Sequence, residues 1–445
     1  MNLRDGRLWL AGLYLLHFAA LHLGFHAIYL DADQLLVADQ AKWMSLGHFF
    51  EPFFFGQAYL LPFEAYLAVP LVWAGLSPLT AVKVVAALFF YLPFAWTACA
   101  HAKDRPWVSV AVTLMFFALP MEYLLAAPMP RGFIVACALA WLGLRALLLG
   151  RGQAWAPVLA WGALVGFCLG SYTSVALMVP ALVLIDDRRR LLLAGLGLAL
   201  GYALFKGVAL FYAFHPEHVV HRFPLLRFTR GHLGAHLTNP TIAPAFAWLV
   251  GLGAAACAAV MALYRPDEAQ RRAWVLRLAL LAVGLAGVIG LMLSTNKIAD
   301  FNAGTPFYSV YRLMLPLPYL ALLVMSVVTL RSPSVVRPPA LATAVTLGVI
   351  FIGLLGWQAV GVQRDREALV LLTSTVPPLP YDRLERQCAR LAEALRVSGQ
   401  PHYTLRGRND ALAYGCSAQF GLPVVQTTFE RRTWLQEHLE RAAQP

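Results

Sequence analysis

Long apolar runs separated by short polar connections dominate the chain from residue 8 to residue 361. Most of these runs approach the roughly 20 residues that a helix needs to cross the hydrocarbon core of a bilayer. The pattern predicts an all-α polytopic membrane protein with about eleven transmembrane helices. The runs cover residues 8–30, 79–100, 107–125, 132–149, 155–172, 174–185, 191–213, 241–263, 274–293, 313–330 and 340–361.

Two of these runs need separate comment. Residues 8–30 are longer than the apolar core of a signal peptide, and no small-residue cleavage pattern separates them from Asp31, so we expect a retained first span. Residues 174–185 are short and reach a full span only if the helix begins near Ser171. We therefore expect a tight turn between this run and the preceding one.

Basic residues concentrate in alternate connections between the runs. Because cytoplasmic loops carry an excess of Lys and Arg, these connections are expected to face the cytoplasm. The N-terminus is then inside and the C-terminus outside, in the inner membrane of a bacterium. The basic residues are Arg4, Arg7, Lys103, Arg105, Arg145, Arg151, Arg188 to Arg190, Arg265, Arg271, Arg272, Arg331 and Arg337, and the outer loops become residues 31–78, 120–131, 214–240 and 294–312.

The first outer loop contains a stretch that tests this topology. Residues 58–76 are apolar enough to span, but a span there would reverse the side of every later basic connection. Pro62, Pro70 and the intervening Glu64 also argue against a helix exposed to lipid. Residues 34–50 mix apolar and polar positions as a helix lying in the membrane plane does. We therefore predict interfacial or re-entrant helices for residues 34–76.

Residues 362–445 have ordinary hydrophobicity and mixed charge, and they predict a small extracytoplasmic α/β domain after the transmembrane domain of residues 1–361. Its expected elements are a strand at 368–372, a helix at 381–397, a strand at 402–405 and a helical piece ending at 437–441. Cys388 and Cys416 lie in this segment, and a disulfide between them is expected if it is outside the cytosol. Cys99, Cys137, Cys168 and Cys257 lie inside apolar runs, as small core residues do.

Composition and charge narrow the class of activity. The net charge of +12 would suggest nucleic acid for a soluble protein, but with 60% hydrophobic and 13% charged residues the topology explains it, and no nucleic-acid partner is expected. The inner loops are too short for a nucleotide-binding domain and contain no glycine-rich phosphate loop. Chemistry is therefore expected at the outer face, where an activated group must arrive on a lipid.

Two carboxylates open the first outer loop. Asp31 and Asp33 follow the first span directly, where they could accept a proton from a hydroxyl nucleophile or hold a divalent cation such as Mg²⁺ or Mn²⁺. From this pair alone the structural interpretation is favoured, because acids also cap the following helix and mark the membrane boundary.

Two stretches resemble a known family. Residues 56–71, GQAYLLPFEAYLAVPL, with Gly75-Leu76-Ser77, resemble the first outer loop of the GT-C superfamily of polyprenyl- or dolichyl-phosphate-sugar-dependent glycosyltransferases. This superfamily includes enzymes similar to protein O-mannosyltransferases and lipid A sugar transferases. Residues 311–318, YRLMLPLP, look like the Arg-Tyr-x-x-x-Pro stretch that opens a late span in the family, with Leu313 at the usual tyrosine position. The resemblance covers residues 1 to about 361.

The resemblance implies an inverting membrane glycosyltransferase of the cell envelope. It would transfer a hexosyl or pentosyl group from a polyprenyl-phosphate carrier to a hydroxyl of a glycan, lipid or protein acceptor. Asp33 is expected to be the catalytic base, and Asp31 to be its orienting partner or a metal ligand. The same loops are expected to contact the substrate through Gln57, Tyr59, Glu64, Glu122, Asp300 and Tyr311.

Cations on the outer side support a phosphate site independently of the resemblance. Charge-assisted hydrogen bonds from such cations would hold a lipid phosphate and stabilise it as it leaves. Individual members could instead snorkel to the membrane surface or pair with nearby acids such as Glu217. The set comprises Arg131, Lys206, Arg222, Arg227, Arg230, Lys297 and Arg312.

Other ionisable residues have both structural and functional interpretations. Glu64 lies in an apolar stretch, where Lys83 could be its structural partner. His215, His218 and His221 have a spacing that a zinc site could use, although no carboxylate or cysteine frames them. His17, His22 and His26 in the first span are expected to be core or interface residues.

Two alternatives remain beside the enzyme. A lipid flippase or small-molecule transporter would need ionisable groups deep within several spans or paired broken helices, whereas the charges here cluster at one face. A noncatalytic protein could also retain the GT-C scaffold and bind a lipid-linked glycan.

Overall fold

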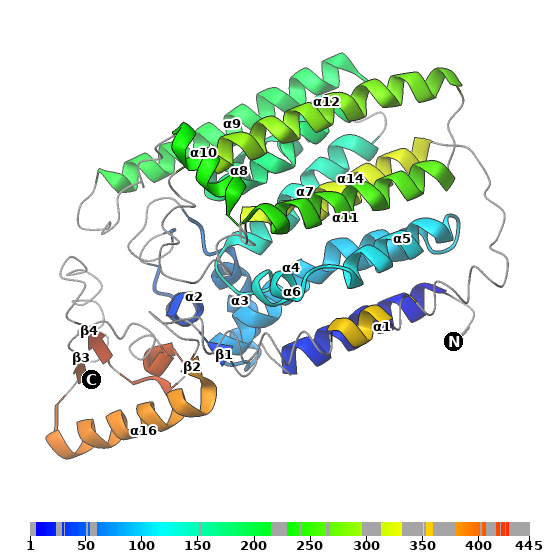
Figure 1. Cartoon of the computed structure of the whole chain (residues 1–445). Coiled ribbons are helices and arrows are strands. Elements are labelled where there is room, and N and C mark those ends of the chain that lie inside the picture. The colour runs from blue at the N-terminus through cyan, green and yellow to red at the C-terminus, as the bar shows by residue number, and fades with distance from the viewer. Residues whose placement is uncertain are drawn as a thin grey trace.

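The structure is a computed structural model of the chain. It describes residues 6–23, 29–30, 32–49, 52–53, 60–150, 154–214, 229–239, 242–263, 268–295, 313–331, 350, 353–358, 379–400, 403–405, 415–418, 420–422 and 424–426. Most of these residues are helical, and the longer helices lie side by side while the shorter elements gather at one end (Figure 1). Four helices in the described part are long and apolar enough to cross a membrane, which fits an all-α membrane protein. They are α4 Pro78–His101, α9 Arg188–Ala213, Pro244–Met261 within α11 Ile242–Leu263, and Arg272–Leu293 within α12 Glu268–Leu293.

Five further predicted spans form helices that are shorter than the apolar runs that predicted them, and most of the run at 340–361 lies outside the described residues. The expectation of eleven full-length spans is therefore wrong for the part of the chain that the structure describes. Apolar residues continue beyond several helix ends because the adjoining turns are buried in the protein, so run length overstates helix length. These helices are α1 Gly6–Leu21, α5 Pro106–Phe117, α7 Phe133–Leu149, α8 Trp155–Ser171 and α14 Pro316–Arg331.

Prolines interrupt two of the predicted runs. The run at 107–125 divides into α5 and the short α6 Met121–Ala126, with Pro120 between them. The run at 174–185 is not an α-helix but two 3₁₀ turns, η2 Thr173–Leu177 and η3 Val179–Leu184, with Pro180 in the first turn of η3. Proline lacks a backbone N–H and disfavours helical geometry in the residue before it, which explains both interruptions.

Helix α4 lies at the centre of the bundle and packs against α1, α2, α3, α5, α7 and α14. Its Phe90 and Phe94 are fully buried and make ring contacts with Phe116 of α5, and Phe94 also contacts Tyr319 of α14. His17 of α1 contacts the hydroxyl of Tyr91 at 2.7 Å and the side-chain amide of Gln358 at 3.0 Å. This histidine is thus an interface residue, as expected.

Helices α8 and α9 approach each other more closely than any side chain would allow. A Cβ added to Gly166 would overlap the backbone carbonyl of Leu198, and one added to Gly201 would overlap that of Ala163. Gly162 and Gly197 meet the facing backbone in the same way. Small residues at four-residue spacing allow helix backbones to pack closely where lipid supplies no hydrophobic driving force. The glycines at this spacing in α8 therefore allow α9 to pack directly against its backbone. We call this contact between the four glycines and the facing backbones the α8–α9 seam.

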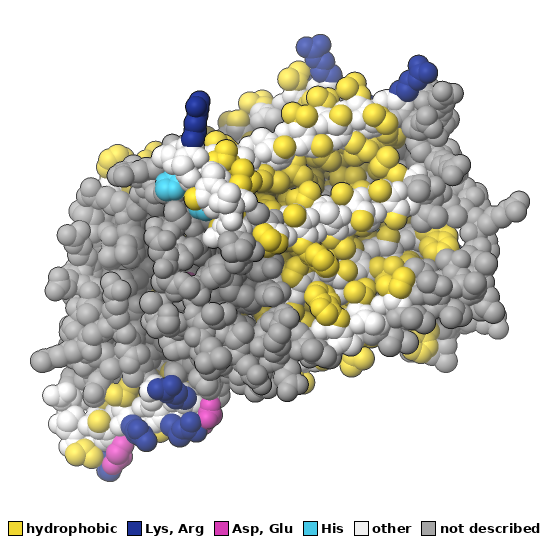
Figure 2. Space-filling model, viewed as in Figure 1, with side chains coloured by type: hydrophobic (Ala, Val, Ile, Leu, Met, Phe, Trp, Pro, Cys, Tyr) yellow, Lys and Arg dark blue, Asp and Glu magenta, His cyan; other side chains and the backbone are white. Residues whose placement is uncertain are grey.

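Basic side chains at one end of the bundle bond to helix C-termini. The guanidinium of Arg105 donates to the Thr329 carbonyl at the end of α14. Arg190 donates to the Gly150 and Ala146 carbonyls at the end of α7. A cation satisfies the last carbonyls of a helix and complements its dipole. In Figure 2 the described sides of the helices between the two ends are covered mainly by hydrophobic side chains.

The stretch predicted to be the first outer loop, residues 31–78, forms two helices at the opposite end, α2 Ala32–Ser45 and α3 Phe63–Trp73. Helix α3 has 11 residues, too few to span a bilayer, in agreement with the predicted short element. Helix α2 differs from the expectation of an amphipathic helix on the membrane surface, since residues 34–41 are all buried. It packs against α3 and α4, and apolar and polar side chains alike are buried between residues 34 and 41.

The C-terminal segment packs on β1 and α2 instead of standing apart as an α/β domain. Leu379–Pro380 (β2) pairs antiparallel with Tyr29–Leu30 (β1) before α16 Tyr381–Ser398 begins. Tyr403–Leu405 (β3) pairs in parallel with Val424–Gln426 (β4). The predicted elements at 381–397 and 402–405 are present, whereas 368–372 and 437–441 lie outside the described residues.

The close α8–α9 seam predicts a contrast between two glycine substitutions. Gly166→Ala should destabilise the protein by about 1–3 kcal/mol, because the added methyl group overlaps the facing backbone. Gly207→Ala in α9 is the matched control, since a Cβ there meets nothing within 4 Å. Thermal unfolding of the detergent-solubilised protein measures both. Equal midpoints for the two variants would contradict the seam.

Candidate functional site

Asp33 and Arg131 form an ion pair at the end of the bundle where the short elements gather. Arg131 Nη1 lies 3.7 Å from Asp33 Oδ2. Asp33 lies in the first turn of α2, and Arg131 comes two residues before α7 begins. The Arg131 side chain is 13% exposed and that of Asp33 is 50% exposed. The predicted base is therefore reachable from solvent beside one predicted phosphate-binding cation.

Glu64 explains why Arg131 is held at this place. Its side chain is fully buried, and its Oε2 accepts a hydrogen bond from the Gly132 N–H at 2.7 Å. Gly132 is the N-cap position of α7 and has no side chain to accept from the first turn of that helix. A carboxylate at a helix N-terminus satisfies unpaired N–H groups and complements the helix dipole. Glu64 of α3 thus caps α7 from another helix. The sequence predicted either an ion pair with Lys83 or a contact with the substrate for this residue, and it did not predict the cap.

Gly132 is required at this junction by its conformation and its surroundings. Its φ is +81°, in the left-handed region that favours glycine, and an added Cβ would overlap the Leu61 carbonyl. The Leu61 N–H is in turn bonded to the Ser171 hydroxyl at the end of α8, at 3.1 Å. Leu61, Gly132 and Ser171, from three separate parts of the chain, therefore contact one another in sequence beside Arg131.

Burial raises the pKa of Glu64 from 4.5 to about 7, against the opposing effect of the nearby backbone N–H groups, including those of Gly132, Val135 and Arg131. Its Oε1 accepts no hydrogen bond from the residues that the structure describes. A proton on Oε1 would leave Oε2 free to accept from Gly132, so Glu64 can cap α7 in either ionisation state.

Many of the predicted site residues lie outside the described part of the chain. These are Asp31, Gln57, Tyr59, His215, His218, His221, Arg222, Arg227, Lys297, Asp300, Tyr311 and Arg312. Glu122 lies on α6, but its side chain is also outside the described set. Of the predicted residues, the structure therefore brings together Asp33, Arg131 and Glu64.

Two other predicted outer cations have local positions. Lys206 of α9 donates to the Gly170 carbonyl at the end of α8, at 3.1 Å, which gives it a structural partner. Arg230 is exposed at the first position of α10, Arg230–Thr238, a helix that packs against α11 and α12. The rings of His232 and His236, both in α10, stack on each other, and His236 bonds to the Leu293 carbonyl at 2.6 Å. Within the described residues no group of His, Cys, Asp and Glu side chains could hold a metal ion.

An apolar groove lies between α11, α12 and α14. Its volume is about 570 Å³, and it is lined by residues such as Leu249, Leu281 and Leu320. The lining contains no charged residue. A space of this chemistry accommodates a hydrocarbon chain. The sequence pattern offered no signal for it, because the groove depends on how three helices pack.

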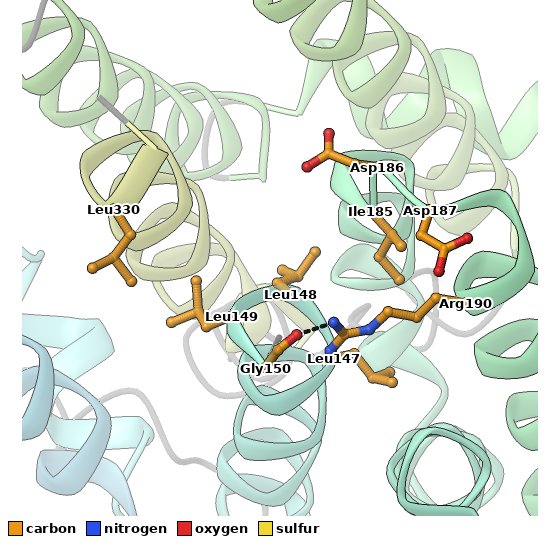
Figure 3. Close-up of a pocket in the computed structure, with 9 residues that line it drawn as sticks. All are labelled: Leu147, Leu148, Leu149, Gly150, Ile185, Asp186, Asp187, Arg190 and Leu330. Atoms are coloured by element: carbon orange, nitrogen blue, oxygen red, sulfur yellow. Dashed lines mark hydrogen bonds between the residues drawn. The ribbon is translucent and has the colours of Figure 1, made fainter. Parts of the chain in front are cut away.

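A second cavity, of about 380 Å³, lies where α7 and α14 end and α9 begins (Figure 3). Its polar groups have structural partners: Arg190 bonds to Gly150, Asp187 caps α9 by accepting from the Arg189 N–H, and Asp186 pairs with Arg277. This end of the bundle also carries Arg105 on Thr329. We therefore assign Arg105, Arg190 and Asp187 to helix capping and Asp186 to an ion pair with Arg277.

Comparisons with protein-family models, curated proteins and solved structures find no match to this chain. The resemblance to GT-C enzymes therefore rests on the sequence stretches described above.

The buried Glu64 predicts a pH-dependent stability. Because its folded-state pKa is raised to about 7 from 4.5, the folded protein holds this proton more tightly than the unfolded chain does. The resulting stabilisation is full below the unfolded pKa and is lost as pH rises through the folded pKa, a change on the order of 3 kcal/mol. Relative to Glu64→Gln, which does not titrate, wild type should lose stability between about pH 5 and pH 8. Thermal unfolding at a series of pH values measures both proteins. An equal change of stability with pH in the two proteins would contradict the raised pKa of Glu64.

Proposed function

We propose that this protein is a membrane glycosyltransferase that transfers a sugar from a polyprenyl-phosphate carrier to an acceptor hydroxyl. The single observation that carries the proposal is the contact between Asp33 and Arg131 at 3.7 Å. The contact brings a carboxylate that can act as a general base next to a cation that can bind a phosphate, at one end of an apolar helical bundle. An acceptor hydroxyl and a lipid phosphate need this combination.

The proposed reaction inverts the anomeric centre. Asp33 accepts the proton of the acceptor hydroxyl as that oxygen attacks the anomeric carbon, and the carbon–oxygen bond to the lipid phosphate breaks on the opposite face. The phosphate leaves with the bonding electron pair, and Arg131 stabilises its charge. Before the donor binds, Arg131 neutralises Asp33, and once the donor binds the guanidinium turns toward the phosphate. Asp33 is then released to act on the hydroxyl.

The apolar groove supports a lipid donor over a soluble one. Its wall on α14 begins at Leu317, a few residues after Arg312, the cation that the sequence predicts to bind phosphate. In our proposal the polyprenyl chain lies between α11, α12 and α14, and its phosphate reaches the end of the bundle that holds Arg131. Lys297, Arg222, Arg227 and Arg230 are proposed to complete the phosphate site.

We also propose a full membrane topology, which goes beyond the four helices of spanning length. All eleven apolar runs are proposed to contribute to the membrane domain, with the N-terminus in the cytoplasm. The Asp33 end then faces the extracytoplasmic side of a bacterial inner membrane, and the end with Arg105 and Arg190 faces inward. A divalent cation, if used, is proposed to bind at Asp31 and Asp33.

The cavities favour an enzyme over a transporter. A transporter would need polar groups lining a path through the bundle. In the described part of the chain, the groove between α11, α12 and α14 is apolar, and the charged side chains of the polar cavity at one end bond to helix ends or form an ion pair. Neither cavity joins the two ends of the bundle.

Substitution of the ion pair tests the proposal. Asp33→Asn should lower the turnover of a polyprenyl-phosphate sugar by about 10²–10⁴-fold, since an amide cannot accept the proton. Arg131→Gln should lower kcat/KM for the donor by at least about tenfold. Asp104→Asn, an exposed acid at the other end of the bundle, is the control that should retain activity. A folded Asp33→Asn protein with wild-type turnover would overturn the role of Asp33.

A further inference from the structure

The C-terminal segment touches the helix that carries Asp33 at several independent points. The Ser417 hydroxyl donates to Asp39 Oδ1 of α2 at 2.8 Å, in a buried position. Lys42, one turn further along α2, donates through Nζ to the Ser417 backbone carbonyl at 2.7 Å. A single residue of the C-terminal segment therefore bonds to two polar side chains of the same helix.

The segment also holds the entrance to α2. Leu379 and Leu30 are paired residues of the antiparallel β1–β2 ladder, and Pro380 pairs with Tyr29. The ladder ends immediately before Asp31, and α2 begins immediately after it. The C-terminal segment thus fixes the chain on the N-terminal side of Asp33 as well as on the C-terminal side.

A disulfide joins these two contacts. Cys388 of α16 and Cys416 are bonded and both fully buried. Next to Cys416, Gly415 lies so close to Leu384 of α16 and Leu35 of α2 that an added Cβ would be 2.8 Å from the first side chain and 3.1 Å from the second. The bond therefore ties the turn that holds Ser417 to the helix that follows β2.

We propose that residues 379–388 and 415–418 form a clamp that positions Asp33 for the transfer reaction. This inference rests on the proposed function and extends it: Ser417, Lys42 and the Cys388–Cys416 bond act through α2 and do not touch the substrate. A displacement of about 1 Å at a reacting group can cost 10²-fold in rate. Helix α2 has 14 residues, so a bond at Asp39 or Lys42 restrains the orientation of Asp33 in its first turn.

Two readouts on three variants test the clamp. The variants are Ser417→Ala, the double variant Cys388→Ser with Cys416→Ser, and Glu393→Gln as a control on the exposed face of α16, where Glu393 pairs only with the neighbouring Arg396 among its described contacts. Hydrogen exchange of the solubilised protein reports on α2 directly, independent of activity. Turnover of a polyprenyl-phosphate sugar reports on the position of Asp33.

The clamp predicts faster exchange at residues 33–45 in the first two variants, with exchange in α4 and α7 unchanged. It also predicts a fall in kcat of about threefold or more for Ser417→Ala and about tenfold or more for the double variant, with KM for the donor near wild type because Arg131 is not on α2. The control should match wild type in both readouts. Ser417→Ala retains the disulfide, so its result does not depend on whether the double variant folds.

Unchanged exchange in α2 for both variants would overturn the clamp, and so would faster exchange with unchanged turnover. Wild-type protein without any transfer activity would instead overturn the proposed function. In that case, the exchange measurement would still decide whether the C-terminal segment holds α2.

Discussion

The buried carboxylate of Glu64 at the start of α7 is the contact on which the geometry of the proposed site depends. It bonds to the Gly132 N–H, and Gly132 in turn fits against the Leu61 carbonyl only because it has no side chain. Together these contacts fix the backbone beside Arg131, which reaches Asp33 on α2. Burying a carboxylate is costly unless it is hydrogen-bonded, so this junction has a narrow choice of residues. The contacts of Glu64 and Gly132 hold the backbone beside Arg131, from which the guanidinium reaches Asp33.

The charged side chains at the two ends of the bundle have different partners. At one end, Arg105 and Arg190 bond to the last carbonyls of α14 and α7, so they serve the helices themselves. At the other end, Arg131 pairs with an acid that is half exposed, and in the proposed mechanism a substrate competes for either partner. Because the Arg131 side chain is largely buried, its charge is screened less than one in water and interacts more strongly with a neighbouring anion. In the proposed mechanism, the apolar groove beside α14 holds the donor lipid.

The sequence predicted the helical regions well because apolar runs reveal what is buried, but it predicted their ends poorly. Pro120 and Pro180 were visible breakers, yet the runs around them were assigned as single spans. The glycine spacing of α8 was also visible, although only the facing backbone of α9 shows its use. The Glu64 cap and the contact of Ser417 with Asp39 join residues distant in the chain, so no local pattern could predict them. The buried position of α2 has the same cause.

A photoactivatable polyprenyl-phosphate probe tests the central claim most directly, since it asks where a lipid phosphate binds without requiring turnover. The probe would be cross-linked to the protein in membranes, and the labelled residues identified by mass spectrometry. A group near the phosphate should label residues around Arg131 and the start of α2, and one on the chain should label α11, α12 or α14. Labelling confined to the end of the bundle that holds Arg190 would contradict the account.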